Sequence, residues 1–177
     1  MSASTIREIF FAAGCFWGAE KFFHLIEGVV ETEVGFANGH TPAPTYREVY
    51  TDTTGYAETV RVRFDPDIVS VAELTRLFLK IIDPLSVNKQ GEDEGTRYRT
   101  GVFYTDPADL PGITEACYEV EQALGQPLAV ERLPLRNYYK AEEEHQRYLE
   151  KNPGGYCHLS PGFFAMAREY RANKKQE

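Results

Sequence analysis

The segment of residues 9–26, IFFAAGCFWGAEKFFHLI, indicates how the chain is expected to fold. Its first residues form a short apolar run that suits a buried strand, and Gly14 then introduces a turn. After the turn, apolar residues recur at helical spacing and predict a helix from about Cys15. The apolar stripe consists of Phe16, Ala19, Phe23 and Ile26. A strand that leads directly into a helix begins a βαβ unit, which predicts a two-layer sandwich of helices on a sheet.

The rest of the chain extends this pattern within one domain, residues 1–177. Ser70 and Glu73 form a capping box that opens a further helix. We expect strands over residues 6–12, 29–36, 57–64, 99–104 and 129–133. We expect helices over residues 15–26, 70–82, 109–124, 138–150 and 163–171, and polar loops over residues 37–55 and 88–95. The expected fold class is α+β, an α/β two-layer sandwich arranged as a ferredoxin-like plait with extended loops and a C-terminal tail.

Composition and charge exclude several classes of function. The formal net charge of −8 argues against a nucleic-acid binder, which needs a basic face. No stretch approaches the roughly 20 apolar residues that span a bilayer, and the apolar run before Cys15 is too short for a signal peptide. The three cysteines match neither a disulfide framework nor a zinc pattern. We therefore expect a cytoplasmic protein that has no bound metal and does not associate with membranes.

Cys15 is the first candidate for a reactive group. It lies where the first strand turns into a helix, and the free N–H groups and dipole of a helix N-terminus favour a thiolate. The alternative is a buried, unreactive thiol that continues the apolar run of Phe10 and Phe11.

Trp17 favours the reactive alternative. It does not lie on the apolar stripe of the helix but on a polar stripe with Glu20, Lys21 and His24. An indole in this position could cap a neighbouring loop, or it could form the wall of an apolar pocket beside the thiol. Phe16, on the apolar stripe, is expected to pack inward and to line the base of such a pocket.

Glu58 is a candidate acid. Alternation in the strand over residues 57–64 places it on the same face as Val60, Val62 and Phe64. Burial on an apolar face raises the pKa of a carboxyl group and makes it a proton donor near neutral pH. The alternative is that Glu58 reaches solvent at the end of the strand.

Two tyrosines and one aspartate are weaker candidates. Tyr46 and Tyr98 could each donate an O–H to a developing oxyanion, although core packing is the usual role of tyrosine. Asp93 lies in an acidic loop, where a solvated surface position is the simpler interpretation.

Several separated motifs, in order over about residues 9–158, resemble the A-type peptide methionine sulfoxide reductases. They begin with GCFWG at 14–18 and Glu20, and with PTY at 44–46 followed by Glu48 and Val49. They continue with GYAE at 55–58, DP at 83–84 and QGEDEGTRYR at 90–99. They end with HQ at 145–146, KNP at 151–153 and YC at 156–157. The chain departs from the usual family pattern at Phe36, Asn38, Tyr56 and Ile82.

The resemblance implies a chemical role for each candidate. Cys15 would attack the sulfur of methionine S-sulfoxide, free or in proteins, and would become a sulfenic acid. Phe16 and Trp17 would hold the substrate's methyl group. Glu58 would protonate the sulfoxide oxygen, which Tyr46 and Tyr98 would hydrogen-bond. Asp93 would organise this polar side of the site.

The resemblance also implies how the enzyme is recycled. Cys157, in a glycine-containing segment that is expected to be mobile from about residue 151, would form a disulfide with Cys15, and thioredoxin would reduce it. The helix around Cys117 places that cysteine on an apolar stripe, so a structural role is expected. Such a cycle for protein repair needs no cofactor and no second subunit.

Three other functions remain open from the residues alone. A cysteine-dependent hydrolase needs an imidazole beside its nucleophile, and the four histidines show no local signature of one. A thiol peroxidase would consume peroxide faster than sulfoxide. A non-enzymatic binding module would tolerate Cys15→Ser.

Overall fold

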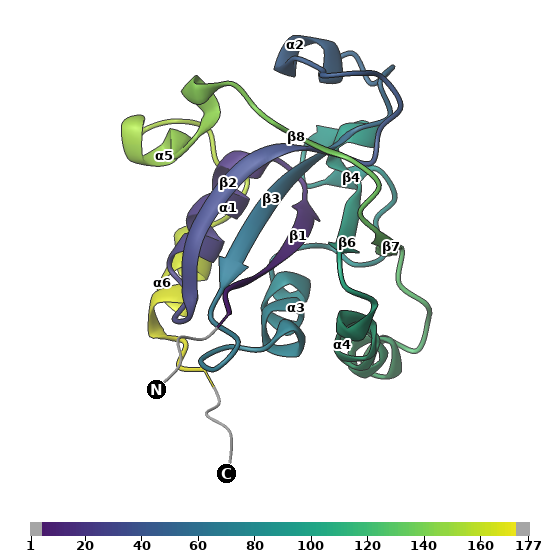
Figure 1. Ribbon diagram of the computed structural model, residues 1–177, viewed down its shortest axis with the longest axis vertical. Coiled ribbons are helices and arrows are strands. Elements are labelled where there is room, and N and C mark those ends of the chain that lie inside the picture. Colours follow the sequence, from purple (N-terminus) through teal and green to yellow (C-terminus); the bar gives the residue numbers. More distant parts are fainter. Residues whose placement is uncertain (1–4, 173–177) are drawn as a thin grey trace.

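A computed structural model describes residues 5–172 as a six-stranded mixed sheet with helices packed mainly against one face (Figure 1). The strand order is β7-β6-β1-β3-β2-β8. The strands are β1 (Arg7–Ala13), β2 (Val29–Ala37), β3 (Ala57–Phe64), β6 (Thr100–Tyr104), β7 (Glu131–Pro134) and β8 (Tyr138–Lys140). Two short strands, β4 (Lys89–Gln90) and β5 (Asp93–Glu94), form a separate hairpin.

The four central strands follow the expected plait. Strand β3 lies between β1 and β2 and is antiparallel to both, so β1 and β2 run in the same direction. Helix α1 (Phe16–His24) connects β1 to β2, and helix α3 (Val71–Lys80) connects β3 to β6. The order β6-β1-β3-β2 is that of a split βαβ plait, and the predicted α+β class is confirmed.

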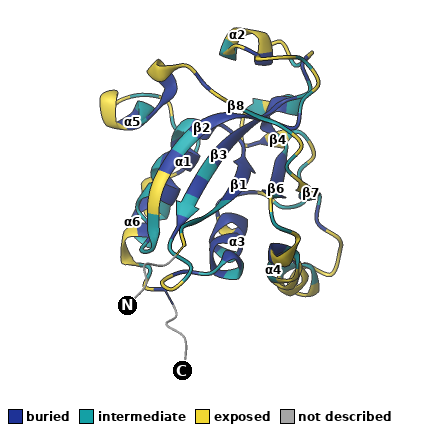
Figure 2. Ribbon diagram, in the orientation of Figure 1, coloured by how far each residue is buried: buried dark blue, intermediate teal, exposed yellow. Residues whose placement is uncertain are grey.

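The main core lies between the sheet and its helices. Helices α1 and α3 pack on the sheet, and α4 (Leu110–Leu124) packs beside α3. The largest buried cluster joins apolar residues of β1, β2 and β3 to those of α1, α3 and α4. A smaller cluster on the other face centres on Phe10 and Phe103, which Leu135 and Tyr138 cover. Figure 2 shows β1 and much of β3 buried, and yellow exposed surface on α4.

Several sequence predictions hold at the level of single residues. Ser70 and Glu73 form the expected capping box of α3. Strand β3 has the predicted bounds. Cys117 of α4 is buried, as its predicted position on an apolar stripe implies. Residues 173–177 of the expected C-terminal tail lie outside the described residues. No helix among residues 5–172 is both long enough and apolar enough to cross a bilayer.

The helix predicted over residues 138–150 is wrong. This segment contains strand β8, the 3-10 turn η3 (Glu143–His145) and the short helix α5 (Tyr148–Lys151). Tyr138 and Lys140 pair with the side of β2 that β3 leaves free, and its backbone groups supply hydrogen-bond partners that favour a strand over a helix here. Arg147 then adopts a left-handed conformation with φ 53°, which interrupts any helix.

Both predicted loops contain short elements. Helix α2 (Tyr46–Val49), capped by Thr45 and Glu48, lies within residues 37–55. The loop over residues 88–95 contains the hairpin of β4 and β5, and the 3-10 turn η1 (Thr96–Tyr98) follows it. A further 3-10 turn, η2 (Pro107–Asp109), precedes α4. The final helix, α6 (Pro161–Glu169), packs on α1.

Candidate active site

Cys15 lies between β1 and α1. Gly14, with φ 81°, turns the chain sharply after the buried end of β1, and Cys15 is the N-cap residue of α1. The side chain is buried, with 5% exposed. Its position at the start of the helix is the one that the sequence predicts.

The thiolate that the sequence predicts for Cys15 is wrong for this structure. Burial raises its pKa well above the ordinary value, and nearby Glu58 raises it further. The N–H of Trp17 hydrogen-bonds the sulfur and lowers the pKa, which is the predicted effect of the helix N-terminus. Because burial is the larger effect, the resting side chain is a thiol and not a thiolate.

Glu58 lies beside this thiol because of strand pairing. The antiparallel register of β1 and β3 matches Phe11 with Val60, so the end of β1 lies beside the start of β3. The Glu58 carboxyl group is 1% exposed and accepts a hydrogen bond from the backbone N–H of Phe16 at 3.1 Å. The alternative of a solvent-exposed Glu58 is therefore wrong.

The Glu58 carboxyl group is a weak acid in this environment. Burial raises its pKa to about 8, against the opposing effects of the Phe16 N–H and of Arg97. At neutral pH the group is therefore mostly protonated. Because Phe16 binds one oxygen, the carboxyl group has a second oxygen that can carry the proton.

Tyr46 and Tyr98 come from separate elements, α2 and η1. Burial and the neighbouring Glu58 carboxyl group raise the pKa of both phenols far above the ordinary value. Cys15 contributes to both shifts, which places the two phenols around the thiol and the acid. Both side chains therefore remain O–H donors over the physiological pH range.

An aromatic stack surrounds the Trp17 indole. Tyr148 stacks on the indole with ring centroids 3.8 Å apart, and Trp17 Nε1 donates a hydrogen bond to His145 Nδ1 at 3.2 Å. Tyr46 stacks on the His145 ring at 4.1 Å. Burial lowers the pKa of His145 and so favours the neutral ring that can accept this hydrogen bond. Phe16 is buried below the stack, 5.9 Å from the His145 ring.

Buried polar groups fasten the segment that carries His145 and Tyr148 to the rest of the fold. The Gln146 amide hydrogen-bonds both the N–H and the carbonyl of Val34 on β2. Glu20 of α1, 2% exposed, accepts hydrogen bonds from Thr32 Oγ1 and from the Arg147 N–H. Glu20 is thus buried, although the sequence places it on a polar stripe.

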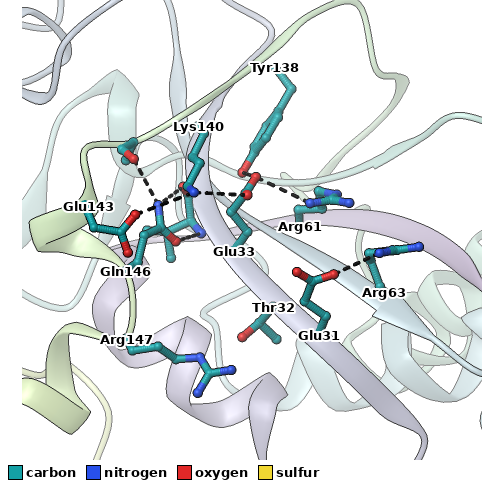
Figure 3. Close-up of polar contacts among 12 residues, drawn as sticks. Glu31, Thr32, Glu33, Arg61, Arg63, Tyr138, Lys140, Glu143, Gln146 and Arg147 are labelled. Carbon is teal, nitrogen blue, oxygen red and sulfur yellow. Dashed lines mark hydrogen bonds and ion pairs between the residues drawn. The ribbon is translucent and has the colours of Figure 1, made fainter.

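Charged contacts on the outer face of β2 complete this attachment (Figure 3). Glu33 accepts a hydrogen bond from the Tyr138 hydroxyl at 2.8 Å and lies 3.5 Å from Arg61 Nη1. Lys140 lies between Glu33 and Glu143. These contacts hold β8 on β2, directly before the segment that reaches Trp17.

Cys157 lies against the first turn of α1. A Cβ atom on Gly18 would lie 2.8 Å from the Cys157 sulfur, so the missing side chain makes room for this cysteine. Cys157 also contributes to the raised pKa of Cys15. All three cysteines are free in this structure. Cys117 is fully buried in the main core.

Asp93 contacts the Cys157 segment. Its Oδ1 atom accepts a hydrogen bond of 3.0 Å from the Tyr156 hydroxyl. Its Oδ2 atom is buried and has no hydrogen-bond partner within residues 5–172. Asp93 is therefore not a solvated surface group, and it contributes to the raised pKa values of both Cys15 and Glu58.

A small cavity of about 100 Å³ also borders the Trp17 indole. Its walls come from α1 and α5 and include His24, Tyr148 and Glu150 but not Cys15 or Glu58. This cavity is therefore separate from the cluster around the thiol.

The sequence comparison decides the family. The family described as peptide methionine sulfoxide reductase matches residues 7–176. The chain belongs to this family. Relatives named peptide methionine sulfoxide reductase MsrA include one from Lachnoclostridium phytofermentans, 50% identical over 92% of this chain and 98% of its own length. Another, from Clostridium perfringens, is 51% identical over 87% of this chain and 98% of its own length.

Solved structures of this family share the fold. Reduced Mxr1 from Saccharomyces cerevisiae is 35% identical, with a TM-score of 0.82 over 95% of this chain and 93% of its own. Methionine sulfoxide reductase A of Corynebacterium diphtheriae is 40% identical, with a TM-score of 0.78 over 86% of this chain and 77% of its own. Mxr1 has also been solved in complex with Trx2, and that chain is 26% identical with a TM-score of 0.58.

In this reductase-family chain, the structure brings all eight candidate residues to the start of α1. The sequence pattern does not single out Tyr148, His145 or His158 as site residues. The motif at residues 145–146 includes His145, but a single helix over residues 138–150 does not predict its contact with Trp17. His158 follows Cys157 directly, and only the folded tail places it beside Gly14 and Gly18.

Proposed function

We propose that this chain reduces methionine S-sulfoxide, free or in proteins, to methionine and so repairs oxidised proteins. The observation that carries the proposal is the Glu58 carboxyl group, whose pKa of about 8 leaves it protonated beside the buried Cys15 thiol. An acid and a thiol within one aromatic-walled site match the needs of a reaction that protonates oxygen and attacks sulfur. Family membership supports the same chemistry.

In the first step, the sulfoxide oxygen accepts hydrogen bonds from Glu58, Tyr46 and Tyr98, and Phe16 and Trp17 hold the methyl group. Protonation of the oxygen by Glu58 makes the substrate sulfur electrophilic, and the Cys15 sulfur attacks it as the thiol proton leaves. The hydroxyl group then passes from the substrate sulfur to the Cys15 sulfur, the transient sulfur–sulfur bond breaks, and methionine departs and leaves Cys15 as a sulfenic acid. The Cys15 sulfur loses two electrons and the substrate sulfur gains two. The thiol proton restores the Glu58 acid, so protons balance. Asp93 organises the polar side of the site.

In the second step, Cys157 attacks the sulfenic acid, forms a disulfide with Cys15 and releases water. A dithiol protein, which we propose to be thioredoxin, then reduces the disulfide by thiol–disulfide exchange. The solved complex of the relative Mxr1 with Trx2 supports a protein partner. We further propose a single catalytic domain over residues 1–177, in which the segment from about residue 151 moves to bring the two sulfurs together.

We also propose that the protein acts in the cytoplasm, as a monomer and without a cofactor. Three unpaired cysteines suit a reducing compartment. The proposed electrons come from thiols alone, so the cycle requires no redox group beyond the partner protein.

The test is a single turnover with each epimer of methionine sulfoxide. Without reductant, the S epimer should yield one methionine per protein, and the free thiols should fall from the three of the sequence to one. Dithiothreitol should restore the thiols and allow turnover. Cys15→Ser should abolish methionine formation. No methionine from the S epimer, or faster turnover of hydrogen peroxide or of an ester, would refute the proposal and favour a peroxidase or a hydrolase.

A further inference from the structure

The His158 imidazole lies across the start of α1. Its Nε2 atom is 3.1 Å from the carbonyl oxygen of Ala13, the last residue of β1. Cβ atoms on Gly14 and Gly18 would lie 3.3 Å from Nε2 and 3.3 Å from Nδ1, respectively. Two glycines on either side of Cys15 thus leave the space that this ring occupies.

The hydrogen bond to Ala13 determines which nitrogen is basic. A carbonyl oxygen only accepts hydrogen bonds, so Nε2 carries the proton and Nδ1 is left unprotonated. Within residues 5–172, Nδ1 is buried and has no hydrogen-bond partner. A buried basic nitrogen without a partner is costly for the fold, which suggests that it has a partner at another stage of the cycle.

The Cys157 sulfur is the neighbouring group that can supply this partner. A Cβ atom on Gly18 would lie 2.8 Å from the Cys157 sulfur and 3.3 Å from His158 Nδ1. Both atoms therefore lie next to the space beside Gly18. In this structure the Cys157 thiol donates to the Leu159 carbonyl oxygen at 3.5 Å, the long distance of a weak sulfur hydrogen bond. Rotation of the thiol toward α1 would direct its proton at the imidazole.

We propose that His158 accepts the proton of the Cys157 thiol when Cys157 attacks the sulfenic acid of Cys15. This inference rests on the proposed function, which supplies the sulfenic acid. The bond that forms joins the two sulfurs, and the S–O bond of Cys15 breaks. The proton from Cys157 passes to Nδ1, Glu58 protonates the departing hydroxyl group to water, and solvent returns the proton from His158 to Glu58. The Cys157 sulfur is oxidised and the Cys15 sulfur is reduced.

The electrostatic surroundings suit this role. Burial lowers the pKa of His158 and Asp93 opposes that shift, so the ring is neutral at neutral pH and able to take a proton. Burial raises the pKa of Cys157, against the opposing effects of Lys21 and the Leu159 backbone. A buried thiol of this kind needs a base to become a nucleophile. Asp93, Cys15 and Lys21 are the titratable groups whose charges act on the Cys157–His158 pair.

The variant His158→Gln separates this role from a structural one. Its amide can still donate to the Ala13 carbonyl, but it has no basic nitrogen. His158→Ala provides a second test, because added imidazole can occupy the vacated space. His40→Gln is the matched control, since His40 is an exposed imidazole in the loop after β2.

The experiment first oxidises Cys15 with one equivalent of hydrogen peroxide, so that it does not depend on sulfoxide reduction. The loss of free thiols is then followed over time. The rate of Cys15–Cys157 disulfide formation should fall about 100-fold in His158→Gln, the scale of general-base catalysis. Imidazole should accelerate His158→Ala but not the wild type. His40→Gln should match the wild type.

The pH profile gives an independent readout. In the wild type the rate should fall below the imidazole pKa, which lies under its ordinary value of 6.5, and should also fall above about pH 8, where Glu58 loses the proton that the departing hydroxyl group needs. In His158→Gln the fall at the imidazole pKa should be absent, and the rate should rise steadily with pH up to about 8, because the Cys157 thiol, whose pKa is raised above 9.0, then ionises without help from a base. Disulfide formation at the wild-type rate and with the wild-type profile in His158→Gln would overturn the inference, as would equal slowing in the control. Absence of methionine formation by the wild type would instead refute the proposed function.

Discussion

Glu58 and Cys15 each retain a proton that an exposed side chain of the same type would hold less tightly. The main cause is shared, because burial disfavours the charged form of either group, and the Glu58 charge would further disfavour a Cys15 thiolate. The reacting acid and the reacting thiol are therefore both neutral in the resting site. A neutral acid beside a neutral thiol holds both protons until a substrate oxygen is present to receive one.

Replacement of Glu58 tests the proposed acid. Glu58→Gln keeps an acceptor for the Phe16 N–H but cannot donate a proton, so methionine formation at pH 7 should fall about 100- to 10,000-fold. In the wild type, the rate of the first turnover should fall as pH rises through about 8, because the carboxyl group then loses its proton. The variant should lack this decline. Single-turnover assays from pH 6 to 10 give the profile, with the exposed Glu115→Gln of α4 as the control. A wild-type rate in Glu58→Gln would contradict the assignment.

The same residue should limit stability. The folded-state pKa of Glu58 is about 8 and the ordinary value is 4.5, so the folded state binds more protons between these pH values. The free energy of unfolding therefore falls as pH rises through this window, by about 3 kcal/mol at pH 7. Glu58→Gln should be more stable than the wild type at pH 7.5 but similar at pH 5. Urea unfolding at the two pH values measures the difference, and an equal difference at both would refute the prediction.

At the scale of elements, the first turn of α1 is shaped by its glycines. Gly14 turns the chain from β1 into the helix, and Gly18 leaves room for Cys157 and His158. A similar backbone demand acts at Asn38, one of the departures from the family pattern. Asn38 has φ 58°, a left-handed conformation that asparagine tolerates better than most residues. Its side chain then bonds the Pro134 carbonyl and the Arg136 N–H.

Gly18→Ala should disturb the proposed resolving step more than the helix. Alanine favours a helix by about 1 kcal/mol over glycine, but the new Cβ would lie 2.8 Å from the Cys157 sulfur. That sulfur ends a movable side chain, so we expect the Cys157 segment to shift and disulfide formation to slow about 10- to 100-fold. Thiol counts after one equivalent of sulfoxide measure the rate. Gly112→Ala in α4 is the control, because its Cβ would meet Ala72 at an ordinary 3.5 Å. Equal rates in both variants would contradict the prediction.

For the whole molecule, the topology gathers groups that are distant in sequence. Pairing of β1 with β3 joins Phe16 to Glu58 across 42 positions. Pairing of β8 with β2 delivers His145 to Trp17 across 128 positions, and the tail returns His158 to Ala13 across 145. Cys117, in contrast, lies on the buried face of α4 in the main core.

This arrangement predicts a cycle with one resolving cysteine. Cys117→Ala should lower the free energy of unfolding by about 1 kcal/mol, since it removes a buried sulfur from the core. It should leave the oxidised protein with a single disulfide between Cys15 and Cys157. Peptide mapping by mass spectrometry after one equivalent of sulfoxide identifies the bond. A stable bond that includes Cys117 in the wild type would refute the one-resolver cycle.

The sequence by itself determined those features that depend on local spacing. Alternation defined β3 and the inward direction of Glu58, the capping box opened α3, and Gly14 placed Cys15 at a helix start. The separated motifs also indicated the family that the comparison shows. The tertiary structure decided the protonation of Cys15, because burial depends on neighbours from other elements. It also decided that residues 138–140 form a strand, because the exposed edge of β2 offered backbone partners that no local pattern reveals.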